Sequence, residues 1–314
     1  MHGDEKKVSV VILAYNEEST IKRTINSLLH QTQKPFEIIL INDGSTDNTL
    51  KKAKKFKNKI RIINKKINQG RAWGYSKGFN TAKGDIVAYL DGDAFAPKNW
   101  IKELKKGFTK RQKNIACVGG YYLGYNTKNQ ITKLENKYNQ IAAKLGLFKL
   151  PSGTNMAYDK KICEKLAVFK NLPRFRCDKY AMDLLIKNKQ LIEIINFPVY
   201  AKMPETVYSY IKQRFRWGRG MPSAGLINKT TLFKKVFVLL LPLIAIPIII
   251  KYPRFFFDIV LFCFLFFLIF NVIISIKWKL YFVEAIHLII LKSIGYYAHA
   301  GGYVFELVKL SVKW

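Results

Sequence analysis

The sequence predicts an α/β fold in which helices flank a mostly parallel sheet. The first observation is a pair of short, nearly continuous apolar runs, residues 8–15 and 37–42, which are typical of strands buried on both faces. The second is the segment between them, where apolar residues recur at helical spacing from Ile21 to Leu29 before Pro35 ends the pattern. Strand, helix and strand in this order predict a β-α-β unit.

The same alternation continues as far as residue 90. Residues 60–64 are expected to form a third strand and residues 86–90 a fourth, with a helix that contains Ala72 and Phe79 between them. Repeated β-α-β units build parallel sheets that helices cover on both sides, and ligands of such sheets bind at the carboxyl ends of the strands. Functional side chains are therefore expected just after each strand.

Composition restricts the class of protein. The chain has 314 residues, of which 49% are apolar, so it can form a sizeable core. Lys and Arg number 53 against 21 Asp and Glu, and the net charge of +32 indicates an anionic partner or surface. The basic residues are spread without the signature of a nucleic-acid-binding module, so no nucleic-acid partner is predicted.

The cysteines and the amino terminus indicate the compartment. The four cysteines are scattered without a CxxC pair, so neither a zinc site nor a disulfide framework is predicted. Residues 1–7 carry no apolar signal region, which places the first domain in the cytoplasm as an expectation.

The last part of the chain differs from the rest. Residues 231–314 carry 9 Lys and Arg against 3 Asp and Glu, and they hold the longest apolar runs. The runs at about 232–250 and 255–276 are each long enough to cross a bilayer. Residues 280–310 contain charged side chains, so a third span, a bundle helix and interfacial helices all stay open. We expect one domain over residues 1–230, followed by a multi-pass domain in the cell membrane.

Acidic side chains follow two of the predicted strands. Asp43 follows the second strand, and the residues after it supply a turn and a helix cap. Asp91 and Asp93 follow the fourth strand, where they can share a hard divalent cation or divide their roles between cation and ribose. A helix cap or a solvated acidic turn would explain each motif separately. Their common position at one edge of the sheet favours a shared ligand site.

Two later segments carry further candidates. Asp178 and Asp183 lie near one face of a helix if their segment is helical, and either can act as a general base beside an acceptor hydroxyl. Gln213, Arg216 and Trp217 precede the first apolar run. That segment fits a basic amphipathic helix at a membrane surface, or a wall beside a diphosphate and a sugar.

Taken together, these motifs resemble family two of the inverting nucleotide-sugar glycosyltransferases, which have a GT-A fold. The resemblance covers residues 8 to about 220 and rests on the order of AYNEE (14–18), NDGSTD (42–47), DGD (91–93), GTN (153–155), the Asp178 segment and QxxRW (213–217). QxxRW followed by apolar runs is similar to the membrane subgroup that includes cellulose, chitin and hyaluronan synthases.

The resemblance implies a role for each motif. Asp43 would recognise the nucleobase, Asp91 the ribose or diphosphate, and Asp93 a Mg²⁺ or Mn²⁺ ion. Asn16 and Glu17 would line the nucleotide pocket.

The later motifs would serve the transfer itself. Arg216 would stabilise the departing diphosphate, next to Gln213 and Trp217. The family usually has a Glu-Asp pair whose Asp is the catalytic base, whereas this chain has Cys177 before Asp178. The spacing to the downstream PET favours Asp178, and Asp183 gives a second register.

The function that the resemblance implies is a membrane-bound enzyme of the cytoplasmic face. It would move a sugar from a nucleotide-sugar donor to a lipid-linked or polysaccharide acceptor with inversion. One alternative is a polyprenyl-phosphate sugar synthase, which such a short chain favours and QxxRW opposes. Another is a catalytically inactive membrane scaffold that binds nucleotide or anionic lipid, which the missing acid favours. An oligomer is compatible with each of them.

Overall fold

A computed structural model describes residues 6–109, 114–174, 176–223 and 282–311, with residues 233, 235, 236 and 240. The chain consists of two compact units. One comprises residues up to 126 together with 142–203, and the other comprises 127–141 together with the residues from 204 onward. The domain boundary predicted near residue 230 lies outside the described residues, and so does the apolar run at 255–276. Only four residues of the run at 232–250 are described.

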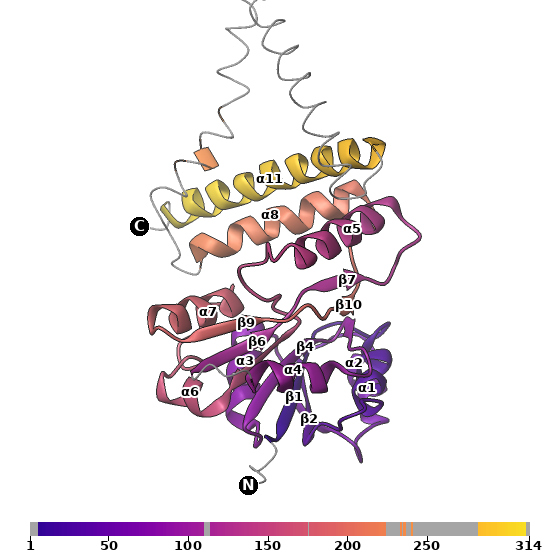
Figure 1. The fold of residues 1–314 in the computed structure, drawn as a ribbon, viewed down its shortest axis with the longest axis vertical. Coiled ribbons are helices and arrows are strands. Elements are labelled where there is room, and N and C mark those ends of the chain that lie inside the picture. Colours follow the sequence, from indigo (N-terminus) through magenta and orange to yellow (C-terminus); the bar gives the residue numbers. More distant parts are fainter. Residues whose placement is uncertain are drawn as a thin grey trace, which may run out of the picture. The chain divides into compact units, whose positions relative to one another are not determined.

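The first unit is built on a seven-stranded sheet (Figure 1). Its strand order is β3-β2-β1-β4-β8-β6-β9. The four strands predicted from the sequence are all present and mutually parallel: β1 (Val8–Ala14), β2 (Glu37–Asp43), β3 (Arg61–Lys65) and β4 (Ile86–Asp91). The prediction of an α/β fold with a mostly parallel sheet is therefore confirmed.

The remaining strands extend this sheet and form a smaller one. β8 (Met156–Asp159) runs antiparallel to both of its neighbours, β4 and β6 (Ile115–Gly119), and β9 (Leu191–Ile194) pairs parallel with β6. A three-stranded sheet has the order β5-β10-β7, formed by Ala94–Phe95, Val199–Ala201 and Tyr122–Gly124.

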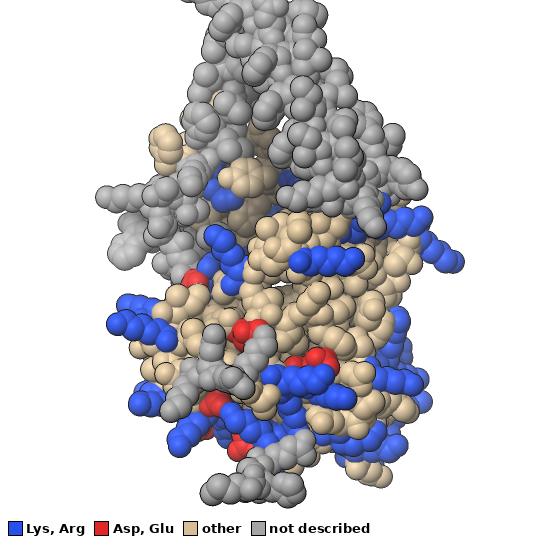
Figure 2. All heavy atoms as spheres, in the orientation of Figure 1, with Lys and Arg blue, Asp and Glu red and all other residues tan. Residues whose placement is uncertain are grey.

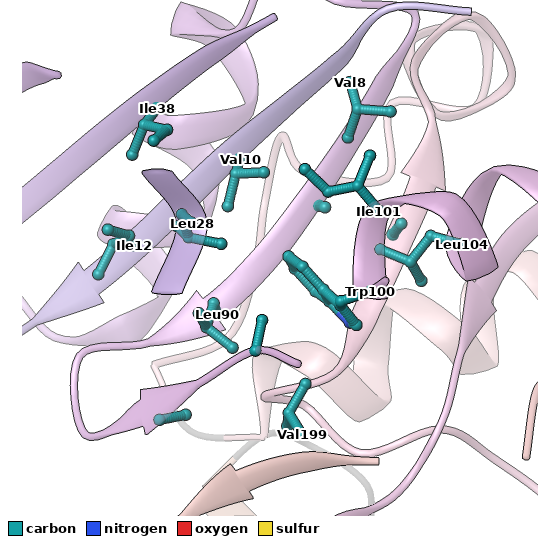
Figure 3. Packing of buried hydrophobic residues seen from close by; sticks show 14 of the residues in the cluster. Val8, Val10, Ile12, Leu28, Ile38, Leu90, Trp100, Ile101, Leu104 and Val199 are labelled. Carbon is teal, nitrogen blue, oxygen red and sulfur yellow. The ribbon is translucent and has the colours of Figure 1, made fainter. Parts of the chain in front are cut away.

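Helices of the first unit pack on both faces of the large sheet. They are α1 (Ile21–Leu29), α2 (Thr49–Lys54), α3 (Arg71–Thr81), α4 (Trp100–Phe108), α6 (Lys160–Lys165) and α7 (Cys177–Lys187). Because successive residues of a strand point to opposite faces, β1 contributes to two cores. Val10 packs with Leu28 of α1 and Trp100 of α4 (Figure 3), whereas Val11 belongs to the core that contains Tyr75 of α3.

The order of the strands determines where a ligand can bind. The chain passes from β1 through β2 to β3 on one side of β1 and then crosses to β4 on the other side. The carboxyl ends of β1 and β4 therefore flank the point where the winding direction reverses, which is the usual ligand position in open α/β sheets. Asn16 and Glu17 follow β1, and Asp91 ends β4.

The second unit contains three helices within the described residues: α5 (Gln130–Lys144), of which residues 130–141 belong to it, α8 (Val207–Ser223) and α11 (Phe282–Ser311). α8 and α11 lie side by side (Figure 1). Their backbones approach so closely that a Cβ atom on Gly218 would collide with the carbonyl of His299, and one on Gly302 with the carbonyl of Phe215. α11 occupies almost all of segment 280–310 as one helix. Among the residues described, none of the helices combines the length and apolarity of a membrane span.

Candidate active site

The loop after β1 is joined to the loop after β2 by a series of hydrogen bonds. The backbone amide of Asn16 donates to Ser45 Oγ (3.0 Å), and Asn16 Oδ1 accepts from the amide of Thr46 (2.8 Å). The amide of Glu17 donates to Thr49 Oγ1 (2.7 Å). Asn16 also adopts a left-handed conformation with φ +57°, which Asn tolerates better than most residues. Its first role is therefore to shape this edge of the sheet.

Asp43 is buried and accepts hydrogen bonds from the next loop. Its Oδ1 accepts from the amide of Gln69 (2.9 Å) and its Oδ2 from the amide of Gly70 (2.7 Å), while its carbonyl accepts from Asn68 Nδ2 (3.0 Å). Each carboxylate oxygen can accept a second hydrogen bond. Asp43 thus fixes the loop before α3 and keeps acceptor capacity for a ligand, so its predicted contact with the nucleobase stays a prediction.

Asp91 forms an ion pair that the sequence did not indicate. Arg71, the first residue of α3, donates from Nη2 to Asp91 Oδ1 (2.9 Å) and from Nη1 to Oδ2 (3.3 Å). The amide of Asp91 donates to Thr154 Oγ1 (3.2 Å). Burial raises the pKa of Asp91, Arg71 opposes the rise, and Asp178 adds to it. Asp91 and Asp178 therefore lie within electrostatic range of each other.

Glycine between the two aspartates allows Glu17 to approach them. A Cβ atom on Gly92 would lie 3.0 Å from Glu17 Cγ and 3.1 Å from the carbonyl oxygen of Leu13. Burial, followed by the charge of Asp93, raises the pKa of Glu17 to about 7. Burial, followed by the charge of Asp91, raises the pKa of Asp93 to about 6. These carboxylates together create a negative potential that Arg71 and Lys202 neutralise only in part.

This acidic turn has the chemistry of a divalent-cation site. Asp91 and Asp93 present hard carboxylate oxygens, which are the ligands that Mg²⁺ and Mn²⁺ take together with substrate phosphates. The raised pKa of Asp93 indicates negative charge that a cation would neutralise. In the part of the chain that the structure describes, no three His, Cys, Asp or Glu side chains converge as metal ligands. The residues present fit an ion held by few protein groups.

The structure separates the two candidates for the catalytic base. Both lie on α7, but Asp183 forms an ion pair with Lys179 of the same helix (2.8 Å), and its side chain is 37% exposed. Asp178 lies at the first turn, where a Cβ atom on Gly153 would be 2.5 Å from its Oδ2. Only Asp178 is thereby associated with the segment that also contacts Asp91 through Thr154.

Cys177 does not replace the acid that usually precedes the base. Its side chain is buried, and burial raises the pKa of its thiol to about 12. The thiol is therefore neutral at physiological pH, and no second negative charge lies directly before Asp178.

The GTN segment, residues 153–155, forms hydrogen bonds with residues of the site and with the core around it. The carbonyl of Gly153 accepts from Tyr75 Oη (2.8 Å), and Thr154 contacts the amide of Asp91 as described above. Asn155 is buried and donates to the carbonyls of Tyr121 and Phe197 while it accepts from Trp100 Nε1. The GTN segment therefore positions Tyr75 and Asp91, and Asn155 connects Trp100 with the backbone at Tyr121 and Phe197.

The residues of QxxRW lie on α8 in the second unit. Arg216 is exposed, whereas Gln213 and Trp217 are half-buried. The ring of Trp217 contacts the guanidinium of Arg214, 4.6 Å from its centroid, and Arg214 also contacts Tyr210 and pairs with Glu135. The roles predicted for Gln213, Arg216 and Trp217 toward the donor remain predictions.

The sequence profile described as glycosyl transferase family 2 matches residues 9–167, which is about half of the chain and contains both acidic motifs at the strand ends. The chain belongs to this family. The prediction that it is a glycosyltransferase is thus confirmed at the level of family.

Several known proteins are similar to the chain. An uncharacterised glycosyltransferase of Haemophilus influenzae is 36% identical over 117 residues, or 36% of either protein. Poly-β-1,6-N-acetyl-D-glucosamine synthase of Staphylococcus epidermidis is 25% identical over 237 residues, which cover 70% of this chain and 55% of the synthase. The match therefore spans only about a third to about half of these relatives.

One solved structure supports the fold. The mannosyltransferase PcManGT from Pyrobaculum calidifontis, in complex with GDP-Man and Mn²⁺, aligns with a TM-score of 0.51 at 15% identity. The alignment covers 70% of this chain and 63% of that protein. It supports the predicted GT-A-like architecture and, at this identity, nothing more specific.

Sequence reasoning missed part of the site. The sequence assigns no role to Tyr75 or Thr154. Arg71 lies between the two acidic motifs, where its residue type suits a phosphate, but its ion pair with Asp91 was not predicted. Arg71 and Thr154 each form a hydrogen bond with Asp91, and Tyr75 forms one with Gly153. No local sequence pattern specifies such contacts between distant residues. A usable signal existed at Arg71, which directly follows Gly70 at the start of a helix after a strand.

Proposed function

We propose that the chain is a membrane-bound inverting glycosyltransferase that uses a nucleotide-sugar donor and a lipid-linked or polysaccharide acceptor at the cytoplasmic face. The observation that carries the proposal is the group of Glu17, Asp91 and Asp93 at the point where the sheet reverses its winding. Within the described part of the chain only Asp91 of these three has an arginine partner, Arg71, so this carboxylate group is under-neutralised. Such a group suits a donor that arrives with a divalent cation. Family membership supplies the reaction class.

The surface of the first unit favours an anionic donor. Figure 2 shows Lys and Arg side chains over much of the visible described face, with few Asp and Glu side chains between them. A net charge of +32 attracts nucleotide diphosphates and anionic lipid headgroups over long range. The acidic groups of the site would then select donors that carry a cation with their diphosphate.

Asp178 would act as the general base in a single displacement. Its carboxylate accepts the proton of an acceptor hydroxyl as that oxygen bonds to the anomeric carbon, and the bond from this carbon to the donor phosphate breaks. The nucleoside diphosphate leaves, and the configuration at the anomeric carbon inverts. A divalent cation, when bound by Asp93 and Asp91, supplies neutralisation of the leaving diphosphate.

The other predicted residues complete the proposed site. Asn16 and Glu17 would line the nucleotide pocket, and Asp43 would contact the nucleobase. Gln213, Arg216 and Trp217 would serve the diphosphate or the acceptor. The poly-β-1,6-N-acetyl-D-glucosamine synthase that the chain is similar to supports a glycan acceptor. The donor class and the cation are proposed from family membership and from the chemistry of Asp91 and Asp93.

A matched pair of variants tests the proposal. Washed membranes that contain the full chain are supplied with radiolabelled UDP- and GDP-sugars and Mn²⁺ or Mg²⁺, and label is measured in the organic phase and in high-molecular-weight precipitate. We expect the native chain to incorporate label from one donor. Incorporation should fall by about 100-fold or more in Asp178→Asn and should stay at the native level in Asp183→Asn. Equal activity of native chain and Asp178→Asn would exclude Asp178 as the base. Saturable nucleotide binding without incorporation from any donor would favour the inactive scaffold.

A further inference from the structure

Arg71 is held in place by two independent sets of contacts. The backbone before it is fixed, because Asp43 accepts from the amides of Gln69 and Gly70, and Gly70 adopts a left-handed conformation with φ +89°. Its guanidinium pairs with both oxygens of Asp91, and it lies over the ring of Tyr75, 5.8 Å from the centroid. Arg71 therefore spans from the end of β2 to the end of β4.

The exposure of the pair is asymmetric. The side chain of Arg71 is 52% exposed, whereas that of Asp91 is 22% exposed. The guanidinium side of the pair is thus the more accessible one, and a ligand from solvent can reach Arg71 more readily than Asp91. Tyr75, whose ring lies beneath the guanidinium, is fully buried and donates to the carbonyl of Gly153, so this wall of the site is fixed.

The pair also engages a group on which the proposed function depends. Asp91 is one of the two carboxylates that suit a divalent cation, and Arg71 pairs with both of its oxygens. Each oxygen keeps a second acceptor position, but a cation on Asp91 would lie beside the positive charge of Arg71, so each of the two weakens the binding of the other. An arginine displaced from a carboxylate finds an equivalent bidentate partner in a phosphate group.

We propose that Arg71 exchanges partners during donor binding, from Asp91 in the donor-free enzyme to the donor diphosphate in the loaded enzyme. This inference rests on the proposed function and deepens it. Without nucleotide, Arg71 competes with the divalent cation for Asp91. With nucleotide, Arg71 and the cation bind different oxygens of one diphosphate. Arg71 therefore couples cation binding to nucleotide binding, and by linkage the coupling acts equally in both directions.

The test compares Arg71→Met with Arg61→Met in the purified full chain. Arg61 is exposed on β3, so its replacement removes the same charge from the same unit and controls for long-range electrostatics. Free Mn²⁺ is followed by electron paramagnetic resonance, first with Mn²⁺ alone and then with Mn²⁺ and UDP or GDP. Circular dichroism establishes that each variant is folded.

Opposite shifts are expected in the two titrations. Arg71→Met should bind Mn²⁺ alone about 10-fold more tightly than Arg61→Met, and should bind the nucleotide with Mn²⁺ about 10-fold more weakly. Nucleotide binding by the native chain with identical titrations for the two variants would overturn this inference alone. Failure of the native chain to bind either nucleotide would overturn the proposed function and the inference with it.

Discussion

Both units of the molecule withdraw carboxylates from solvent, fully for Glu135 and Glu306 and partly for Glu17 and Asp93, but they surround them differently. In the second unit, Glu135 pairs with Lys292 (2.9 Å) and Arg214 (3.3 Å), and Glu306 pairs with Arg219 (2.7 Å). In the first unit, no Lys or Arg among the described residues forms an ion pair with Glu17 or Asp93, and the pKa of each carboxyl is raised.

The difference distinguishes two uses of buried charge. A buried carboxylate with cationic partners contributes to the arrangement of helices, because removal of one member leaves the others without compensation. A buried carboxylate without such partners weakens the fold when ionised, and its retention favours a ligand role. The second unit therefore has the charge pattern of a packed helix interface, and the first has that of a cation site.

The largest expected effect contrasts Glu135→Gln with Asp93→Asn. Glu135→Gln leaves Arg214 and Lys292 close together without a counter-charge, so we expect protection against hydrogen exchange in α8 to fall by about 3 kcal/mol. Asp93→Asn removes an uncompensated negative charge, so we expect the first unit to gain about 1 to 3 kcal/mol at pH 8. Amide hydrogen exchange of the full chain, analysed by mass spectrometry, measures both.

An exposed ion pair provides the control for this contrast. Glu103 contacts Lys106 at the surface (2.7 Å, with side chains 29% and 58% exposed), so Glu103→Gln should change protection by less than about 1 kcal/mol. Loss of protection in both Glu135→Gln and Asp93→Asn would show that the two units do not differ in the way described.

A smaller effect is expected from glycines in the second unit. Gly302 approaches the backbone carbonyl of Phe215 too closely for a Cβ atom, whereas a Cβ atom on Gly301 would lie 3.8 Å from the Phe215 ring. Gly302→Ala should therefore lower protection in α8 and α11 by about 1 to 3 kcal/mol. Gly301→Ala should be neutral or stabilising by up to about 1 kcal/mol, because Ala favours helix.

Comparison of the two glycine substitutions also distinguishes the effect of packing from the effect of helix propensity. Both lie in α11, so both substitutions change the intrinsic helix propensity equally. Hydrogen exchange of the two variants under one set of conditions gives the packing contribution as their difference. Equal protection in Gly301→Ala and Gly302→Ala would mean that α8 and α11 are not in backbone contact.

The sequence predicted the first unit well where the signal was local. The strands β1 to β4, the helix α3 and the acidic residues at strand ends follow from apolar runs, helical spacing and turn residues. The insertion of antiparallel β8 between β4 and β6 depends on pairing between distant segments, which no local pattern specifies.

At the candidate site, as in the sheet, local sequence patterns did not specify contacts between residues that are far apart in the chain. Asp178 and Asp183 were equivalent as residue types, and the structure distinguishes them by Gly153 beside one and Lys179 beside the other. Arg71 could be seen as a basic residue near a helix start, but its pairing with Asp91 requires the ends of β2 and β4 to be placed in space. Burial, which raises the pKa of Glu17 and Asp93, is likewise a property of the fold.

The smallest expected effect concerns the pH dependence of Glu17. The pKa of Glu17 is about 7 in the folded chain and 4.5 for an ordinary glutamate. Between these values the folded chain binds more protons than the unfolded chain, so the free energy of unfolding falls as pH rises. The penalty is absent below pH about 4.5 and complete above pH about 7. Because Glu17 is only partly buried, we expect a loss of about 1 to 2 kcal/mol across this window.

Glu17→Gln should remove this contribution, so the stability of the variant relative to the native chain should increase from pH 4 to pH 8. Urea unfolding at each pH, without divalent cations, measures this difference.

Glu18→Gln is the matched control at the adjacent position. The pKa of Glu18 is lowered, chiefly by its hydrogen bonds with Asn48, so this substitution should change the slope in the opposite direction. The same slope in the native chain and Glu17→Gln would contradict the assignment of Glu17 to the under-neutralised group. Added Mn²⁺ should reduce the slope of the native chain, because a cation at the neighbouring aspartates stabilises ionised Glu17 as well.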